Sequence, residues 1–174
     1  TTERQHPTCL PPPATTLLAR GKPANSEPDY RQPLPVYLPL PRTDRDQAAC
    51  LYSLATTLAK LGQLADAEPY YRQALTLYQD IPNTEEQQAN CMHALANTLD
   101  DLGKPAQAEP YYRQALTLYQ DIPGTERDQA ACLHLLATTL ADLGQLANAE
   151  PYYRQALTLY QDIPNTEEKQ ATCL

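Results

Sequence analysis

The sequence predicts an all-α fold, a solenoid of stacked antiparallel helix pairs, and three observations support that prediction. The phrase AEPYYRQALTLYQDIP occurs three times, beginning at Ala67, Ala108 and Ala149, at a constant spacing of 41 residues. Within each unit the apolar residues recur at steps of three and four, which places them along one face of a helix. Neither helix of the unit shows the alternation of a strand. A fixed period of this size indicates stacked repeats, and two helices per unit exclude propellers and leucine-rich repeats.

The first predicted helix of a unit carries an apolar stripe from Cys50 to Leu61 and ends at Gly62. In the next unit Thr84 precedes two acidic residues, so we expect its hydroxyl to cap the helix, with Gln87 completing a capping box. Thr43, Thr125 and Thr166 begin the matching segments.

The second predicted helix carries its stripe from Leu64 to Ile81 and ends at Pro82. Pro69 lies in its early part, where it removes a backbone donor and is expected to bend the entry turn. An acid and an arginine stand four residues apart in each copy, in the order that favours a surface ion pair. These pairs are Glu27 and Arg31, Glu68 and Arg72, Glu109 and Arg113, and Glu150 and Arg154.

The repeat register divides the chain into five segments. Residues 1–41 form a degenerate, proline-rich first repeat, residues 42–82, 83–123 and 124–164 form repeats two to four, and residues 165–174 form the first half of a further helix. Prolines such as Pro12 and Pro35 interrupt both helices of the first repeat. Because each interior proline costs a helix about 3 kcal/mol, we expect irregular backbone over residues 1–41.

Composition limits the class of partner. The chain has 174 residues, a formal charge of −8 and neither Phe nor Trp, so Leu, Ala and Tyr must form its core. Nucleic acids and anionic membranes need a basic face, and the acidic charge therefore argues against both. A neutral or basic protein or peptide segment fits the charge better. No apolar run approaches the roughly 18 residues of a membrane span.

The five cysteines follow the same period. Cys9, Cys50, Cys91, Cys132 and Cys173 each stand 41 residues after the one before. Equivalent positions on stacked helices lie roughly 8–10 Å apart, beyond the reach of a disulfide. We therefore expect five buried, reduced thiols, which favours a reducing compartment and predicts a cytoplasmic location.

At this point the residues carry a family resemblance. One unit presents Leu51, Leu54, Ala55, Leu58, Ala67, Tyr71, Ala74 and Pro82 in order, and the next two units repeat the series. This pattern resembles the tetratricopeptide repeat, and its long period is similar to the extended repeats of kinesin light chains. The resemblance implies a right-handed superhelix in which small residues such as Ala55 and Ala67 let the paired helices approach closely.

Residues able to perform chemistry are sparse. His93 and His134 each follow a cysteine by two residues, on nearly opposite sides of a helix, so the pair cannot share a metal. The chain has no glycine-rich phosphate loop, and the pair Asp100 and Asp101 is interpreted as a solvated helix end. The sequence therefore predicts no enzymatic activity, no cofactor and no metal site.

The resemblance implies that the first helix of each repeat lines a concave groove. The family's clamp for a C-terminal dicarboxylate is not reproduced, since only Asn97 matches it, and ligands with acidic ends are disfavoured. The alternative is that the candidate side chains are solvated and have no role in binding. The candidate groove residues are Tyr52, Thr56, Lys60, His93, Asn97, Asp101, His134, Thr138 and Asp142.

These observations predict a non-catalytic scaffold for protein–protein interaction. One alternative is a structural, self-associating solenoid that stacks head to tail into filaments, and another is an accessory domain of a catalytic chain. The final stretch TEEKQATCL matches the first half of a repeat. It predicts that something outside these 174 residues covers the last repeat, because a bare end would leave an apolar face in water.

Overall fold

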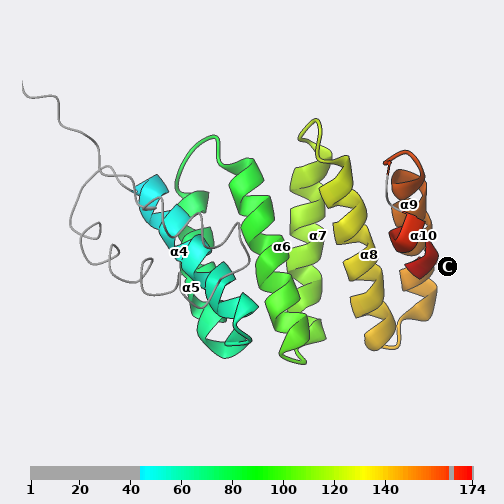
Figure 1. Ribbon diagram of the computed structural model, residues 1–174, viewed down its shortest axis with the longest axis horizontal. Helices are drawn as coiled ribbons and strands as arrows, with labels where there is room; N and C mark the ends of the chain where they lie inside the picture. Colours follow the sequence, from blue (N-terminus) through cyan, green and yellow to red (C-terminus); the bar gives the residue numbers. More distant parts are fainter. Residues whose placement is uncertain (1–43, 165–166, 174) are drawn as a thin grey trace, which may run out of the picture. The chain divides into compact units, whose positions relative to one another are not determined.

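A computed structural model of the protein describes residues 44–164 and 167–173 (Figure 1). The proline-rich segment 1–41, for which irregular backbone is predicted, lies outside these described residues. All regular elements in the described ranges are helices, as the sequence predicts. They are α4 (Asp44–Lys60), α5 (Leu64–Gln79), α6 (Glu85–Asp101), α7 (Pro105–Gln120), α8 (Glu126–Asp142), α9 (Leu146–Gln161) and α10 (Glu167–Thr172). None of the helices in these ranges has the length and apolar character that crossing a membrane requires.

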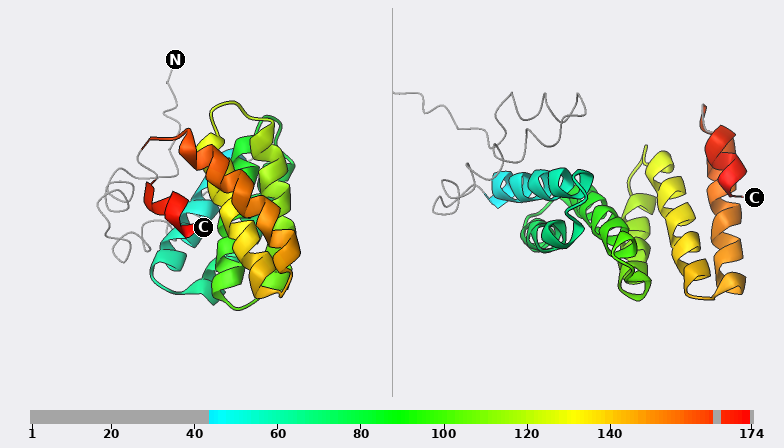
Figure 2. Two further views of the ribbon diagram at one scale, coloured as in Figure 1. Left: turned by 90° about the vertical axis from the view of Figure 1, so that its right-hand side faces the viewer. Right: turned by 60° about the horizontal axis from the view of Figure 1, so that its bottom comes forward.

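The helices pair as hairpins in two compact units, Thr1–Asn83 and Thr84–Leu174. In the first unit α4 packs against α5. In the second unit α6 pairs with α7 and α8 with α9, α7 packs on α8, and α10 lies against α9 (Figure 2). We refer to α4, α6, α8 and α10 as A helices and to α5, α7 and α9 as B helices.

Small residues let the two helices of each hairpin meet. Ala55 and Ala67 are completely buried in the first unit, as are Ala96 and Ala108 in the α6–α7 hairpin. Ala137 and Ala149 occupy the same places in the α8–α9 hairpin, with at most 1% of their surface exposed. A methyl group is the largest side chain that such a close approach admits, which explains the regular alanines of the sequence.

Glycine ends each long A helix, as predicted for Gly62. Gly62 has a φ of +77°, and the amide of Gln63 then donates to the carbonyl of Leu58 at 2.9 Å. Lys104 and Gln145 make the same bond to Leu99 and Leu140, each at 2.8 Å. This Schellman arrangement satisfies carbonyls at the helix end and turns the chain into the B helix.

The prediction that threonine side chains cap the A helices is wrong. Thr84 and Thr125 precede α6 and α8, but neither side chain makes a capping bond to its own helix. Thr125 is buried, and its Oγ1 donates to the carbonyl oxygens of Tyr119 and Ile122 at 2.6 Å and 2.8 Å. The hydroxyl therefore adds a donor for carbonyls at and just after the C-terminal end of α7, at the junction between two hairpins.

The i,i+4 ion pairs form on the described B helices as predicted. Arg72, Arg113 and Arg154 approach the glutamate four residues earlier at 3.0, 2.9 and 2.7 Å. The pair of Glu27 and Arg31 lies outside the described residues. Each B helix continues without interruption through its internal proline at positions 69, 110 and 151.

The prediction of five reduced thiols is wrong at one position. Cys91, Cys132 and Cys173 are not disulfide-bonded, whereas Cys50 is part of a disulfide. The spacing argument applies to cysteines on stacked helices, and it does not restrain a partner that lies outside the described helices. A disulfide at Cys50 removes the premise of five reduced thiols from which a reducing compartment was predicted.

The close approach of α6 and α7 predicts a strong asymmetry between two alanines of α7. Ala108→Leu places three extra carbon atoms where no surface is exposed, and we expect it to lower the free energy of unfolding by about 1–3 kcal/mol. Ala106→Leu on the exposed side of the same helix is the matched control and should change stability little. Urea denaturation followed by circular dichroism measures both, and equal losses would contradict the packing argument.

Candidate partner-binding groove

The candidate groove residues repeat one geometry in every hairpin. The first position carries a ring, and this ring packs edge-on against a tyrosine of the B helix in the same hairpin. Such T-shaped contacts are favourable because the positive edge of one ring meets the negative face of the other. The pairs are Tyr52 with Tyr71, His93 with Tyr112 and His134 with Tyr153, with ring centroids 5.7, 5.9 and 5.6 Å apart.

The second position binds the hydroxyl group of the same tyrosine. Tyr112 donates to Asn97 Oδ1 at 2.6 Å, and the hydroxyl of Tyr153 lies 3.1 Å from Thr138 Oγ1. The hydroxyl of Tyr71 lies 3.2 Å from Thr56 Oγ1 in the first unit. The first two positions therefore join helix A to helix B inside each hairpin, and they are only half-exposed.

The third position is open to solvent. Lys60, Asp101 and Asp142 are all exposed. Tyr52, Thr56 and Lys60 belong to the first unit, while the other six candidates belong to the second. Within the second unit the structure brings Asn97, Asp101, Thr138 and Asp142 to one recess.

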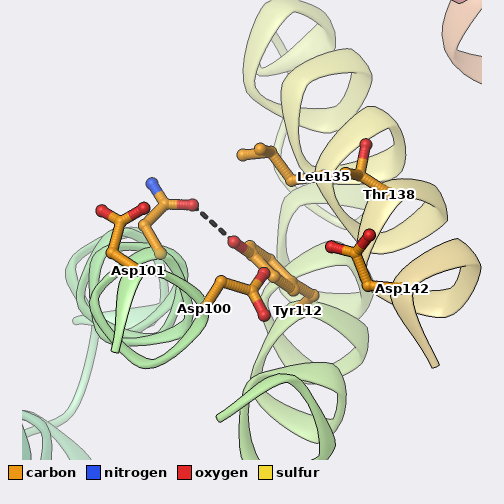
Figure 3. Close-up of a pocket in the computed structure, with 7 residues that line it drawn as sticks. Asp100, Asp101, Tyr112, Leu135, Thr138 and Asp142 are labelled. Atoms are coloured by element: carbon orange, nitrogen blue, oxygen red, sulfur yellow. Dashed lines mark hydrogen bonds between the residues drawn. The ribbon is translucent and has the colours of Figure 1, made fainter. Parts of the chain in front are cut away.

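That recess is a pocket of about 380 Å³ in the second unit (Figure 3). Residues from α6, α7 and α8 contribute to it, and the hydrogen bond between Tyr112 and Asn97 lies on its wall. Asp100, Asp101 and Asp142 supply three carboxylates, and Leu135 adds an apolar side chain. The complete lining is Asn97, Asp100, Asp101, Tyr112, Leu135, Thr138 and Asp142.

Asp100 is held by a bond between two A helices. Its Oδ2 accepts a hydrogen bond from Thr139 Oγ1 at 2.6 Å, while its Oδ1 is buried without a hydrogen-bond partner among the described residues. Burial raises the pKa of the Asp100 carboxyl, and repulsion from Asp142 and Asp101 adds to the rise, against the hydrogen bond from Thr139. The charged form of the Asp100 carboxyl is therefore disfavoured.

The interpretation of Asp100 and Asp101 as a solvated helix end is wrong for Asp100. Asp101 is exposed, but Asp100 is half-buried and bonded to α8. A comparison between repeats could have found it, because the equivalent positions hold Ala59 and Ala141. The same comparison could have found Leu135, because Ser53 and Ala94 occupy the equivalent positions in the preceding repeats.

His93 and His134 favour the neutral form. Burial lowers the pKa of His93, against the attraction of Asp128, and burial with the nearby Lys169 lowers the pKa of His134. His134 Nδ1 lies 3.3 Å from Cys173 Sγ, and burial raises the pKa of that thiol. This pair therefore consists of a thiol and a neutral imidazole, which lacks the thiolate that nucleophilic chemistry uses.

Nucleophilic chemistry is equally disfavoured at Cys132, where burial raises the pKa of the thiol to about 12. Its sulfur lies 3.2 Å from the carbonyl oxygen of Tyr112, a contact between α8 and α7. No group of three or more His, Cys, Asp or Glu side chains in the described part of the chain is placed to hold a metal ion.

Comparison with known families gives a match over most of the chain. A family model described as "Tetratricopeptide repeat" matches three overlapping stretches, residues 14–80, 46–121 and 87–162. No curated protein sequence matches the chain significantly.

Several solved structures are similar in fold. The crystal structure of BtubC (BKLC) from P. vanneervenii superposes with a TM-score of 0.78 at 21% identity, covering 92% of this chain and 65% of that protein. A putative kinesin light chain from Podosopora anserina with nearly identical TPR-like repeats gives 0.75 at 16% identity, covering 92% and 78%. The apo form of RapI gives 0.82 at 14% identity, covering 91% and 57%. At these identities the likeness concerns the fold alone.

The raised pKa of the Asp100 carboxyl predicts that Asp100→Asn stabilises the protein, by an amount that depends on pH. The folded-state pKa is raised, so the stability contributed by protonated Asp100 is lost as pH rises through that folded pKa. The amide keeps an oxygen for Thr139 without the charge, and we expect a melting temperature about 2 °C higher at pH 7. The gain should vanish near pH 3, where the natural carboxyl is itself protonated.

Calorimetric melting of both proteins between pH 3 and pH 8 measures this difference. Asp121→Asn, at an exposed position after α7, controls for the change in net charge. A lower melting temperature for Asp100→Asn at pH 7 would mean that the carboxylate stabilises the repeat interface.

Proposed function

Because the chain belongs to the tetratricopeptide repeat family, we propose that it is a non-catalytic protein-interaction scaffold whose A helices bind a basic segment of a partner protein. The observation that carries the proposal is the carboxylate pocket between α6 and α8. Asp100, Asp101 and Asp142 all line it, on a chain with a formal charge of −8. A lysine or arginine side chain is the natural occupant of such a recess.

The uncharged lining suits the rest of such a side chain. Leu135 offers apolar contact to the methylene groups of lysine or arginine, which pack on apolar surface while their charged end stays among polar groups. Asn97 Oδ1 and Thr138 Oγ1 are already bonded to Tyr112 and Tyr153, so the carboxylates are left to bind the charged end. An arriving cation would also relieve the repulsion among the three carboxylates, and it would stabilise charged Asp100 most.

Charge differs between the repeats at the exposed third position. Lys60 stands in the first unit where Asp101 and Asp142 stand in the second. We therefore assign recognition of basic side chains to the second unit. The ring residues Tyr52, His93 and His134 each contact a tyrosine of their own hairpin and contribute no positive charge of their own at neutral pH.

Self-association head to tail is the second candidate. Helix α4 is the first described helix, and its sequence is similar to that of α8. Three of its residues, Ala48, Cys50 and Leu54, have no exposed surface. Stacking through that face would first require its present contacts to open, which disfavours filaments. Light scattering over a hundredfold concentration range tests this, and we expect a constant particle mass.

If the acidic pocket binds basic side chains, neutralising its exposed carboxylates should weaken the binding of a basic peptide. Asp101→Asn combined with Asp142→Asn should weaken binding of a lysine-rich 12-residue probe peptide by about fivefold at low salt, equivalent to about 1 kcal/mol. Half-molar salt should abolish most of the difference, because exposed charges are screened. Fluorescence anisotropy with a labelled peptide measures both effects.

The matched control is Asp121→Asn with Asp162→Asn. These exposed residues follow α7 and α9 and give the same change in net charge away from the pocket. A second control peptide carries glutamine in place of each lysine. An equal loss of affinity in the two double variants would show that net charge, and not the pocket, attracts the peptide.

A further inference from the structure

The side chain of Thr139 in α8 lies close to two oxygen atoms. Its Oγ1 is 2.6 Å from Oδ2 of Asp100, on the neighbouring helix α6, and 2.9 Å from the carbonyl oxygen of Leu135, one turn earlier in α8. Thr139 has no exposed surface, so its hydroxyl group is shielded from solvent. Because a hydroxyl group carries one hydrogen atom, it can donate fully to only one of these two oxygen atoms.

The equivalent threonines, Thr57 in α4 and Thr98 in α6, show which of the two bonds belongs to the helix itself. Both residues are buried. The hydroxyl oxygen of each lies 2.9 Å from the carbonyl oxygen four residues earlier in its own helix. Thr139 keeps this distance within α8, and its contact with Asp100 is additional.

Two arrangements of hydrogen atoms fit these distances. A charged Asp100 takes the Thr139 hydrogen away from the carbonyl oxygen of Leu135. A protonated Asp100 donates its own hydrogen to Thr139 Oγ1, and Thr139 then donates to Leu135. Only the protonated arrangement makes both bonds at once.

The second oxygen of the carboxyl group also favours the protonated arrangement. Asp100 Oδ1 is buried and has no hydrogen-bond donor among the described residues. The hydroxyl group of Tyr112 lies nearby, but it donates its one hydrogen to Asn97 Oδ1 at 2.6 Å. A buried charge without a donor costs far more free energy than a buried neutral oxygen, so the pocket by itself disfavours the carboxylate.

The titratable groups around Asp100 act in the same direction. Asp101 on α6 and Asp142 on α8 repel a charge on Asp100, and Tyr112 faces it from α7 as a neutral phenol. Burial raises the pKa of Asp100 most, and the two carboxylates add to the rise. The rise is opposed by the hydrogen bonds that Thr139 and, in place of its bond to Asn97, Tyr112 can donate to the charged form.

We propose that Asp100 holds a proton in the free protein and releases it when a basic side chain of a partner binds in the carboxylate pocket. This inference rests on the proposed function and adds a control by pH. Asp100 is part of the pocket lining, so a cation bound there lies beside its carboxyl group and offsets the repulsion that a second negative charge meets.

The release changes one bond at the interface between α6 and α8. The O–H bond of Asp100 breaks, and the proton passes to the solvent. The Thr139 hydrogen then turns from Leu135 to the new carboxylate, and a hydrogen bond to a charged acceptor is stronger than one to a neutral oxygen. Binding of the basic segment therefore also strengthens the contact between the two A helices.

Proton release fixes the sign of the pH dependence of binding. Affinity for a basic segment rises with pH while Asp100 is protonated in the free protein, by up to about tenfold per pH unit if one full proton is released. Once Asp100 is ionised in the free protein, a further rise in pH releases no proton from it, and the affinity levels off.

The proton on Asp100 can be measured without a ligand. The full 174-residue chain is labelled with carbon-13 at the side-chain carboxyl groups of aspartate, and the signal of Asp100 is assigned by its loss in Asp100→Asn. In a pH titration followed by nuclear magnetic resonance, this signal should change at a higher pH in the folded protein than in the same chain unfolded in urea.

The release is measured by isothermal titration calorimetry with the lysine-rich 12-residue peptide. Binding enthalpies in two buffers that differ in ionisation enthalpy give the number of protons released at each pH between pH 4 and pH 8. We expect the natural chain to release up to one proton per peptide. Asp100→Asn should lose this release, and Asp121→Asn, at an exposed position, should keep it.

Three results would overturn the proposal. The first is a titration of Asp100 at the same pH in the folded and the unfolded chain, because Asp100 is then charged in the free protein. The second is peptide binding without proton release, which leaves the proposed function intact. The third is equal release by the natural chain and Asp100→Asn, which assigns the proton to another group. Absence of peptide binding, with a late titration of Asp100, would instead overturn the proposed function and the release step together while confirming the proton.

Discussion

Each hairpin depends on one tyrosine of its B helix, which joins the two helices by two kinds of contact. In α7, Tyr112 has no exposed surface, its ring meets the ring of His93 edge-on, and its hydroxyl donates to Asn97. A buried phenol needs a polar partner, because an unmade hydrogen bond in the interior costs roughly 1–3 kcal/mol. The A helix supplies the oxygen four residues after the ring, one turn further along the same face. This pair of contacts fixes the rotation of each A helix against its B helix.

That constraint decides which groove positions remain available for binding. A residue whose ring or oxygen is already used by the tyrosine cannot give the same atom to a partner without weakening the hairpin. Under the proposed function, recognition therefore passes to positions that the tyrosine does not use, and the repeats differ at some of these. Asp100 replaces Ala59 and Ala141, and Leu135 replaces Ser53 and Ala94. In the second unit these substitutions turn a structural surface into an acidic pocket.

Much of the fold was predictable because the period, the alanines and the glycines each have a local physical cause. Gly62 was correctly predicted to end its helix from the position of the apolar stripe alone. Thr125 was not, because a threonine before a helix usually caps that helix, and only the packed junction reveals the competing carbonyls of Tyr119 and Ile122. The disulfide of Cys50 could not be foreseen from spacing, since spacing describes stacked helices only.

The candidate site was less predictable than the fold, for a related reason. The sequence placed Asn97, Asp101, Thr138 and Asp142 on corresponding helix faces, and the structure brings these four to one pocket. It could not show that Asp100 turns inward to Thr139, because that bond spans 39 residues and exists only after two hairpins have stacked. Local patterns report which face a residue occupies, but the protonation and availability of its side chain depend on neighbours from other repeats.

The B helices show how identical sequences acquire different roles in one chain. The shared AEPYYRQALTLYQ stretch of α7 and α9 has one chemistry, yet Leu116 in α7 is buried while Leu157 in α9 is half-buried. Apolar surface that stabilises the interior of a repeat array is available for binding wherever no neighbour covers it. Half-buried Leu157 is therefore equivalent to Leu116 in chemistry and differs from it only in position. Under the proposed function the varied A helices supply selectivity for charge, while the B helices share one sequence, AEPYYRQALTLYQ, and hold the A helices in place.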